Sequence, residues 1–310
     1  MQVVGLCASH TPLKDIHHPG ADLAAEVAAT FGKIRAWVRK FDPQLVIVFG
    51  PDHFNGFFYH LMPSFCIGAA ADSIGDWNTP QGALRIDQDM AEACVRHLHK
   101  RGVDIAISYR MQVDHGLAQT LQMSFEWQAL PPIIPIFVNC AAPPLPPFAR
   151  IIALGRAVGE FARECDQRVL IVGSGGLSHD PPLPSLRDSP PEVRERLIAG
   201  GVLPPATRAA REARVADEGL QQLAGSSPNT PVNPNWDRRF LELLRARDFD
   251  RLSTFEDEEL TGLAGRGGHE VRTWVATAAA LSEIPNTHSH LHMYQPIPIW
   301  IAGFGVLTIE

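Results

Sequence analysis

Three histidines stand where apolar strand patterns end, and this position makes them candidates for chemistry. His10 comes after the apolar run 3–8, and His53 comes after the run 45–50. His179 ends a glycine-rich turn that follows a third apolar run. In open α/β sheets, ligands and catalytic groups collect at the carboxyl ends of the strands. The three histidines therefore predict one shared site.

A metal centre is one chemistry that such residues allow. Two neutral imidazoles and one carboxylate on one face of Fe(II) leave positions open for a substrate and O₂. Glu270 is the best candidate for the carboxylate, because it follows a glycine pair at the start of a predicted helix, where the helix dipole favours an anion. An ordinary glutamate in a first helical turn is the alternative.

A second group of residues could move protons or orient a ring. His115 follows Asp114, in the same order in which His53 follows Asp52. Either aspartate could hydrogen-bond an imidazole and fix its tautomer. His115 could instead be a loop histidine beside a helix-capping aspartate. His179 is available as an acid or a base.

The histidines at 288, 290 and 292 share a spacing of two, which would place them on one face of a strand. We expect an exposed loop instead, because the segment is polar and precedes Tyr294 and Pro296. These histidines are predicted to have no role in the site.

The elements that must position the candidates alternate between strand and helix. Apolar residues at spacings of three and four predict a helix from Leu23 to Phe41, just before Pro43. This alternation favours an α/β fold, a single domain over 1–310 with an open, largely parallel or mixed sheet and helices on both faces. Further predictions are helices at 87–100, around 240–244 and at 268–282, and strands at 105–109, 133–138 and 296–306.

The region from about 180 to 235 differs from the rest because prolines interrupt it repeatedly. Proline breaks regular structure, and only Thr207–Ala224 has a helical pattern there. Long irregular segments in compact domains are often functional. We therefore expect a proline-rich insertion that covers the site or makes subunit contacts.

The composition limits the kinds of molecule that the protein is expected to bind. The chain has 310 residues, 45% hydrophobic and 20% charged, with a formal net charge of −7 and no long run of Lys or Arg. A small molecule is expected as the ligand, rather than nucleic acid or a membrane. No apolar run approaches the roughly 18 residues of a membrane span and no signal pattern opens the chain, so a cytoplasmic protein is expected. The scattered cysteines are expected to be reduced and buried.

The chain closely resembles the class III extradiol ring-cleavage dioxygenases, and within them those that act on 2,3-dihydroxyphenylpropionate and 2,3-dihydroxycinnamate. The resemblance runs nearly end to end. It is carried by SHTP at 9–12, PDHFNGFFY at 51–59, MQVDHG at 111–116, GSGGLSH at 173–179, NPNWD at 233–237 and WIAGFG at 300–305.

The resemblance implies roles for the candidate residues. His10, His53 and Glu270 would bind Fe(II), His115 would donate a proton and His179 would accept one. Four further residues could hold these side chains in position through contacts on the side away from the metal: Asp52, Asn55, Tyr59 and Asp114.

The resemblance also implies a reaction and an assembly. A catechol with a substituent beside its hydroxyls would react with O₂, and the ring would open next to the hydroxyls. The expected substrate is 3-(2,3-dihydroxyphenyl)propanoate, the product is 2-hydroxy-6-oxonona-2,4-dienedioate, and the chain is expected to form a homo-oligomer. The substrate carboxylate would need a cation or backbone donors, and the sequence singles out no arginine for this role.

Two other functions fit some of the same residues. A zinc-dependent hydrolase could use two histidines and a glutamate with an activated water. A binding protein could keep the fold and the metal site without catalysis. The presence of both His115 and His179 beside the three proposed ligands favours a working enzyme.

Overall fold

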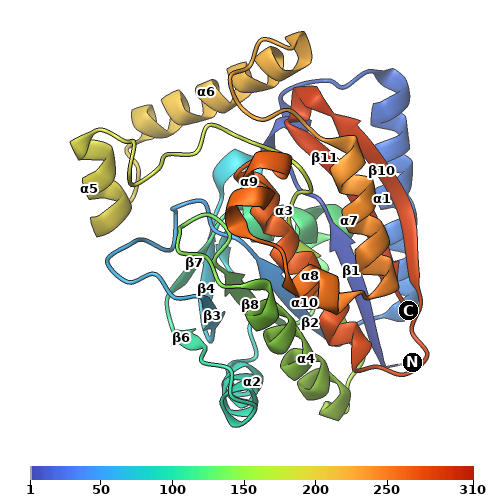
Figure 1. Cartoon of the computed structure of the whole chain (residues 1–310). Coiled ribbons are helices and arrows are strands. Elements are labelled where there is room, and N and C mark those ends of the chain that lie inside the picture. The colour runs from blue at the N-terminus through green and yellow to red at the C-terminus, as the bar shows by residue number, and fades with distance from the viewer. Residues whose placement is uncertain (1) are drawn as a thin grey trace.

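A mixed sheet of eight strands forms the centre of the protein, whose computed structural model describes residues 2–310 (Figure 1). The strands are β1 (Val3–Ala8), β2 (Leu45–Gly50), β3 (Phe65–Gly68), β6 (Ala106–Ser108), β8 (Ile133–Val138), β9 (Val169–Ser174), β10 (Ser289–Ile297) and β11 (Ala302–Ile309). Their order is β10-β11-β1-β9-β2-β8-β3-β6. The central strands β1, β9, β2 and β8 run parallel, and β11 and β3 flank them in antiparallel orientation.

Both faces of the sheet are buried because its central strands are apolar without interruption. In β2, Leu45 and Ile47 pack into one core, whereas Val46 and Val48 pack into the core on the opposite face. This follows from the alternation of side chains along a strand. One face is covered by α2 (Gln88–Lys100), α4 (Phe148–Glu164) and α10 (Val271–Ser282), and the other by α1 (Ala21–Phe41) and α3 (His115–Ser124). The predicted α/β fold is confirmed.

A second, smaller sheet lies beside the first. It consists of β5 (Gln81–Ala83), β4 (Ala71–Ile74) and β7 (Met111–Val113) in that order. β4 and β7 run parallel, with Ala71 opposite Met111 and Ser73 opposite Val113. The segments that follow these two strands therefore leave the sheet at the same edge.

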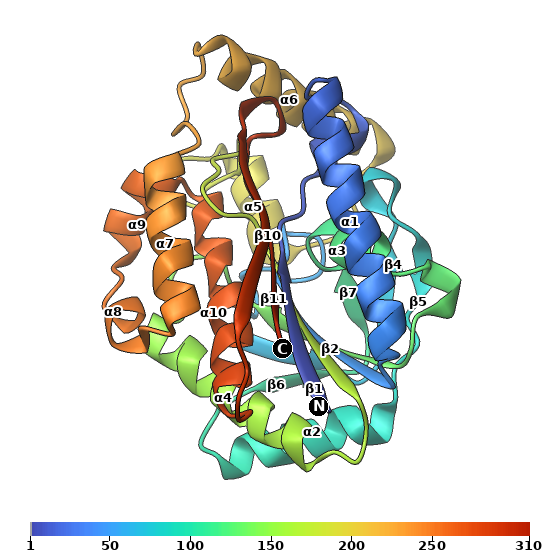
Figure 2. The same ribbon diagram turned by 90° about the vertical axis from the view of Figure 1, so that its right-hand side faces the viewer.

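We call residues 180–235 the cover, because α6 crosses above the carboxyl ends of the central strands (Figures 1 and 2). The cover contains α5 (Pro191–Ala199) as well as α6 (Pro205–Ala224). The prediction of only one helix there was wrong. Pro191 and Pro205 begin these helices rather than breaking them, since a proline in the first turn gives up no hydrogen bond.

After the cover, the chain forms helices that lead back to the sheet. They are α7 (Pro234–Ala246), α8 (Phe249–Ser253), α9 (Asp257–Ala264), a 3-10 turn (Gly267–Glu270) and α10. No helix within residues 2–310 is long and apolar enough to cross a membrane. All five cysteines are buried and unpaired, as expected.

The end of the chain differs from the prediction. A loop at His288–His292 and one strand over 296–306 were expected, but β10 and β11 form an antiparallel pair joined by a 3-10 turn (Pro298–Trp300). β10 is an edge strand, and an edge tolerates both polar residues and proline. Within β10 the rings of His290 and His292 lie 4.4 Å apart, and His292 is the extra residue of a register irregularity between Leu291 and Met293.

Candidate active site

The predicted histidines come together at the carboxyl ends of neighbouring strands. β9 lies between β1 and β2, and Ala8 is opposite Ser174 at the ends of their strands. His10 follows β1, His53 follows β2, and His179 follows the turn after β9. The prediction that these strands share one edge is confirmed.

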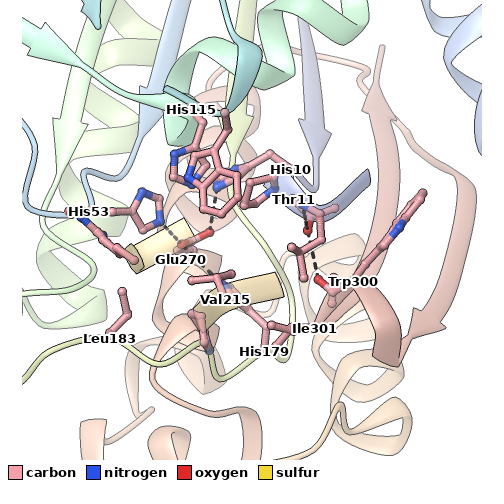
Figure 3. A pocket seen from close by; sticks show the side chains of 16 residues that line it. His10, Thr11, His53, His115, His179, Leu183, Val215, Glu270, Trp300 and Ile301 are labelled. Atoms are coloured by element: carbon pink, nitrogen blue, oxygen red, sulfur yellow. Dashed lines mark hydrogen bonds and ion pairs between the residues drawn. The ribbon is translucent and has the colours of Figure 1, made fainter. Parts of the chain in front are cut away.

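Glu270 lies at the centre of the site (Figure 3). Its Oε1 is 3.1 Å from His53 Nε2 and 3.4 Å from His179 Nε2, and its Oε2 is 3.6 Å from His10 Nε2. Oε2 also accepts a hydrogen bond of 2.7 Å from the backbone N–H of Gly176. The ring of His115 stacks on that of His53, with the centroids 4.4 Å apart. We call these five side chains, of His10, His53, His115, His179 and Glu270, the His–Glu cluster.

Each imidazole of the cluster has a hydrogen-bond partner at Nδ1. An acceptor behind the ring keeps the proton on Nδ1, so that Nε2 carries the lone pair that binds a metal or a proton. The pairs are His10 with Ser174 Oγ at 3.2 Å, His53 with Asp114 Oδ2 at 3.1 Å, His115 with Asp76 Oδ2 at 2.6 Å, and His179 with the carbonyl O of Leu177 at 2.8 Å.

Asp76 is a site residue that the sequence did not reveal. It is buried in the 3-10 turn Asp76–Asn78, and its Oδ1 accepts a hydrogen bond of 2.8 Å from the backbone N–H of His115. The parallel pairing of β4 with β7 brings it there, because the two residues lie beyond the ends of these strands. No local pattern at position 76 indicates this contact.

The residues expected to support the ligands fall into three groups. Asp114 Oδ2 binds His53 and also accepts from Asn55 Nδ2 at 2.8 Å, while Oδ1 caps α3. Asp52 accepts the backbone N–H groups of Asn55, Gly56 and Phe57, so it shapes the turn. Tyr59 lies outside the pocket of the cluster and lines a different cavity.

Two glycines make room for the ring of His179. A Cβ on Gly176 would lie 2.5 Å from His179 Cε1, and a Cβ on Gly267 would lie 2.2 Å from His179 Cδ2. Neither distance is possible between nonbonded atoms. The backbone at Gly176 and Gly267 therefore approaches the ring of His179 more closely than any other residue type would allow.

Burial and mutual attraction set the charges in the cluster. Burial lowers the pKa of His10 to about 3, although Glu270 opposes this shift. Burial would raise the pKa of Glu270, but His179 and His10 hold it well below its usual value. Burial would lower the pKa of His53, but Asp114 and Glu270 raise it well above normal. A neutral His10 and an anionic Glu270 are ligating forms, and a metal would displace the proton of His53.

The side chains can hold a metal in more than one combination. His10, His53 and His115 each offer a nitrogen, and these atoms lie within 4.8 Å of one another. Asp76, Asp114 and His115 form a second such group, but their polar atoms already bond to one another and to His53. Only Glu270 adds a carboxylate that touches both His10 and His53. The site is thus suited to a metal ion.

The cluster forms one end of a pocket that is otherwise mainly apolar (Figure 3). Leu183, Arg211 and Val215 of the cover line its walls, so this segment borders the site. Sequence reasoning did not single out Arg211 or Trp77. The other lining residues are Thr11, Pro12, Leu13, Trp77, Pro181, Trp300, Ile301 and Ala302.

A family model and individual relatives both match this chain over nearly its whole length. A family model described as the catalytic LigB subunit of aromatic ring-opening dioxygenase matches residues 5–305. The chain is 48% identical to a protein of Pseudomonas putida over 97% of this chain and 96% of the relative. It is 46% identical to a protein of Dechloromonas aromatica over 97% of both chains. Each relative is named 2,3-dihydroxyphenylpropionate/2,3-dihydroxicinnamic acid 1,2-dioxygenase 1.

Proposed function

The chain belongs to the LigB family of aromatic ring-opening dioxygenases, and on this premise we propose that its substrate is 3-(2,3-dihydroxyphenyl)propanoate. The protein is an extradiol dioxygenase of aromatic catabolism. With this substrate, O₂ would open the ring beside the hydroxyls and give 2-hydroxy-6-oxonona-2,4-dienedioate. The observation that carries the proposal is the His–Glu cluster at the end of an apolar pocket.

We propose that His10, His53 and Glu270 bind Fe(II). Cis ligands that each lie about 2.1 Å from a divalent ion, at right angles, are about 3.0 Å apart. The contacts of 3.1 Å and 3.6 Å from Glu270 to the two histidines are compatible with this spacing after a small adjustment. Bound there, Fe(II) would supply coordination of the catechol oxygens and of O₂ on its open face.

His179 and His115 are suited to proton transfer on two flanks of the ligands. His179 Nε2 lies beside Glu270, and the Leu177 carbonyl fixes the Nδ1–H tautomer. With Glu270 engaged by a metal instead of by His179, this Nε2 would take a proton from a catechol hydroxyl. His115 stacks on His53, and its Nδ1 lies 2.6 Å from Asp76 Oδ2. We propose that His115 donates the proton that ring cleavage requires.

Oxygen uptake tests this function directly. The protein is loaded with Fe(II) under anaerobic conditions and mixed with a panel of catechols substituted beside the hydroxyls. We expect O₂ consumption and a yellow ring-fission product. Zn(II) should not restore activity, which separates this reaction from hydrolysis at a zinc site. A protein that holds Fe(II) but consumes no O₂ with any catechol contradicts the proposal.

We further propose that residues 1–310 act as one domain and that the protein is a homo-oligomer. Exposed apolar side chains on one face of α6 support the second point: Leu220 is 49% exposed and Leu223, three residues later, is 59% exposed. Neighbouring apolar groups that face solvent are typical of contact surfaces. Light scattering should give a mass of at least two chains, and the mass of one chain would contradict the assembly.

A further inference from the structure

The cover places one arginine against the pocket of the His–Glu cluster. Arg211 lies in α6, one turn before Val215, and both line the pocket. Its Nη2 donates a hydrogen bond of 2.8 Å to the carbonyl O of His53. Within residues 2–310, this is the one hydrogen bond recorded for its guanidinium. A guanidinium has five N–H donors in a planar fork, so most of its donors remain for a ligand.

Two other arginines near the site differ from Arg211, because each of them pairs with a carboxylate. Arg266 Nε lies 2.8 Å from Asp180 Oδ1, and Arg272, which is fully buried, pairs with Asp257. Arg211 has no carboxylate within ion-pair distance in the described part of the chain. Burial lowers its pKa, but Asp114 and Asp52 oppose this shift, and arginine stays charged in proteins. Asp114, Asp52 and Asp76 act on this charge from a distance, and none of them pairs with it directly.

The remaining walls contain no competing cation. Among the described residues, Arg211 is the one Lys or Arg that lines this pocket. Its neighbours there, Leu183 and Val215, are apolar. A ligand that fits these walls therefore has an apolar body and a single anionic group directed towards α6.

On the basis of the proposed ring cleavage, we propose that Arg211 binds the carboxylate at the end of the substrate side chain. Its guanidinium contacts the backbone carbonyl of His53, whose ring is a proposed metal ligand. A catechol held at the cluster would therefore place a short side chain in the same pocket that Arg211 lines. The fork of Arg211 can pair with both oxygens of a carboxylate. The substrates are thus catechols with a short anionic tail beside the hydroxyls.

Selectivity between two substrates tests this role. The Fe(II)-loaded enzyme is assayed with 3-(2,3-dihydroxyphenyl)propanoate and with 3-propylcatechol, which has a tail of similar length and no charge. We expect Arg211→Gln to lower the ratio of the two kcat/KM values by about 10- to 100-fold, the range for a charged hydrogen bond. Arg211→Lys should recover part of this loss. Any effect on the loop of His53 is shared by both substrates and cancels in the ratio.

Arg196→Gln is the matched control. Arg196, in α5, donates a hydrogen bond of 3.0 Å to the carbonyl O of Phe54 but does not line the pocket. It holds the same loop to the cover from a second helix. Its substitution should leave the substrate ratio within about twofold of wild type, about 0.4 kcal/mol. An equal change in the ratio in both variants would mean that the loop contact, and not the charge, sets selectivity.

Binding of 3-phenylpropanoate, which has the carboxylate but no hydroxyls, provides a readout that does not depend on turnover. Calorimetry should detect it with the wild-type holoenzyme and show weaker binding with Arg211→Gln. If the wild type cleaves both catechols equally well, the role of Arg211 is overturned and ring cleavage stands. If the wild type cleaves neither but binds 3-phenylpropanoate through Arg211, ring cleavage fails and the anion site stands.

Discussion

The His–Glu cluster and the cover meet at one pocket but are built differently. His10, His53 and Glu270 are each at most 6% exposed, and they are fixed at the ends of strands or at the start of a helix packed on the sheet. The cover lies on the surface and is held to the neighbouring loop by a few hydrogen bonds, such as that from Arg211 to the His53 carbonyl. On the proposed function, residues at the ends of the sheet strands determine the reaction, and residues of the cover determine which substrate binds.

The largest effect that tests this separation is expected from Glu270→Gln. The variant keeps the shape but loses the charge that touches His10, His53 and His179. Iron binding and O₂ uptake should both be lost, by more than the roughly 10- to 100-fold typical of removing an outer partner of a ligand. Metal analysis and an oxygen electrode measure the two. The control is Glu242→Gln, an exposed position in α7, and retention of iron by Glu270→Gln would remove Glu270 from the ligand set.

Asp114→Asn and Asp76→Asn should separate metal binding from proton transfer within the cluster. Asp114 holds the proposed ligand His53, whereas Asp76 holds the proposed proton donor His115. We expect Asp114→Asn to weaken iron binding by about 10- to 100-fold. Asp76→Asn should lower kcat by a similar factor with the iron content unchanged. Loss of iron in Asp76→Asn would instead favour His115 as a ligand, in the group with His10 and His53.

The sequence predicted the cluster better than its surroundings, and the reason is physical. His10, His53 and His179 follow strands whose apolar runs are visible locally, and parallel neighbours end at one edge. The role of Glu270 came from the family resemblance, because an ordinary first-turn glutamate has the same local pattern. Asp76 could not be found, since its contact with His115 depends on the pairing of β4 with β7.

Errors in the prediction concentrate where sequence signals have two meanings. Prolines in the cover were interpreted as breaks, but Pro191 and Pro205 begin helices. The polar segment around His290 was interpreted as a loop, but it forms an edge strand that needs only one apolar face. Arg211 could not be distinguished from the other arginines of its helix before α6 was placed over the pocket.

Gly267→Ala should give a smaller effect that is confined to one side of the cluster. The new Cβ would lie 2.2 Å from the ring of His179, so the ring must move. We expect lower kcat with normal iron content, because His179 is not a proposed ligand. Gly262→Ala, in α9, is the control, since no atom lies within 4 Å of the new Cβ. The control should be active and slightly more stable to heat, because alanine favours a helix by about 1 kcal/mol over glycine.

The smallest effect is expected from chemical modification of the thiols. The rate of this reaction reports how far the cover moves in the native protein. All five cysteines are buried, and none belongs to residues 180–235. Burial raises the pKa of Cys66 to about 12 and raises that of Cys140 as well. A thiol reagent should therefore react slowly with the native protein even near pH 9, where a free thiol of pKa about 8.5 is mostly ionised. After unfolding in denaturant, all five thiols should react.

One thiol makes this measurement a test of the cover. Cys140 lines the neighbouring cavity together with Leu183 and Leu186 of the cover, so an outward movement of this segment would expose it first. Slow reaction at all five positions with and without substrate would mean that the cover does not move far enough to expose Cys140. The opposite result would be fast reaction of a single thiol in the native protein that is absent in Cys140→Ser and suppressed by substrate. It would mean that the cover moves together with the part of the core that holds the cluster.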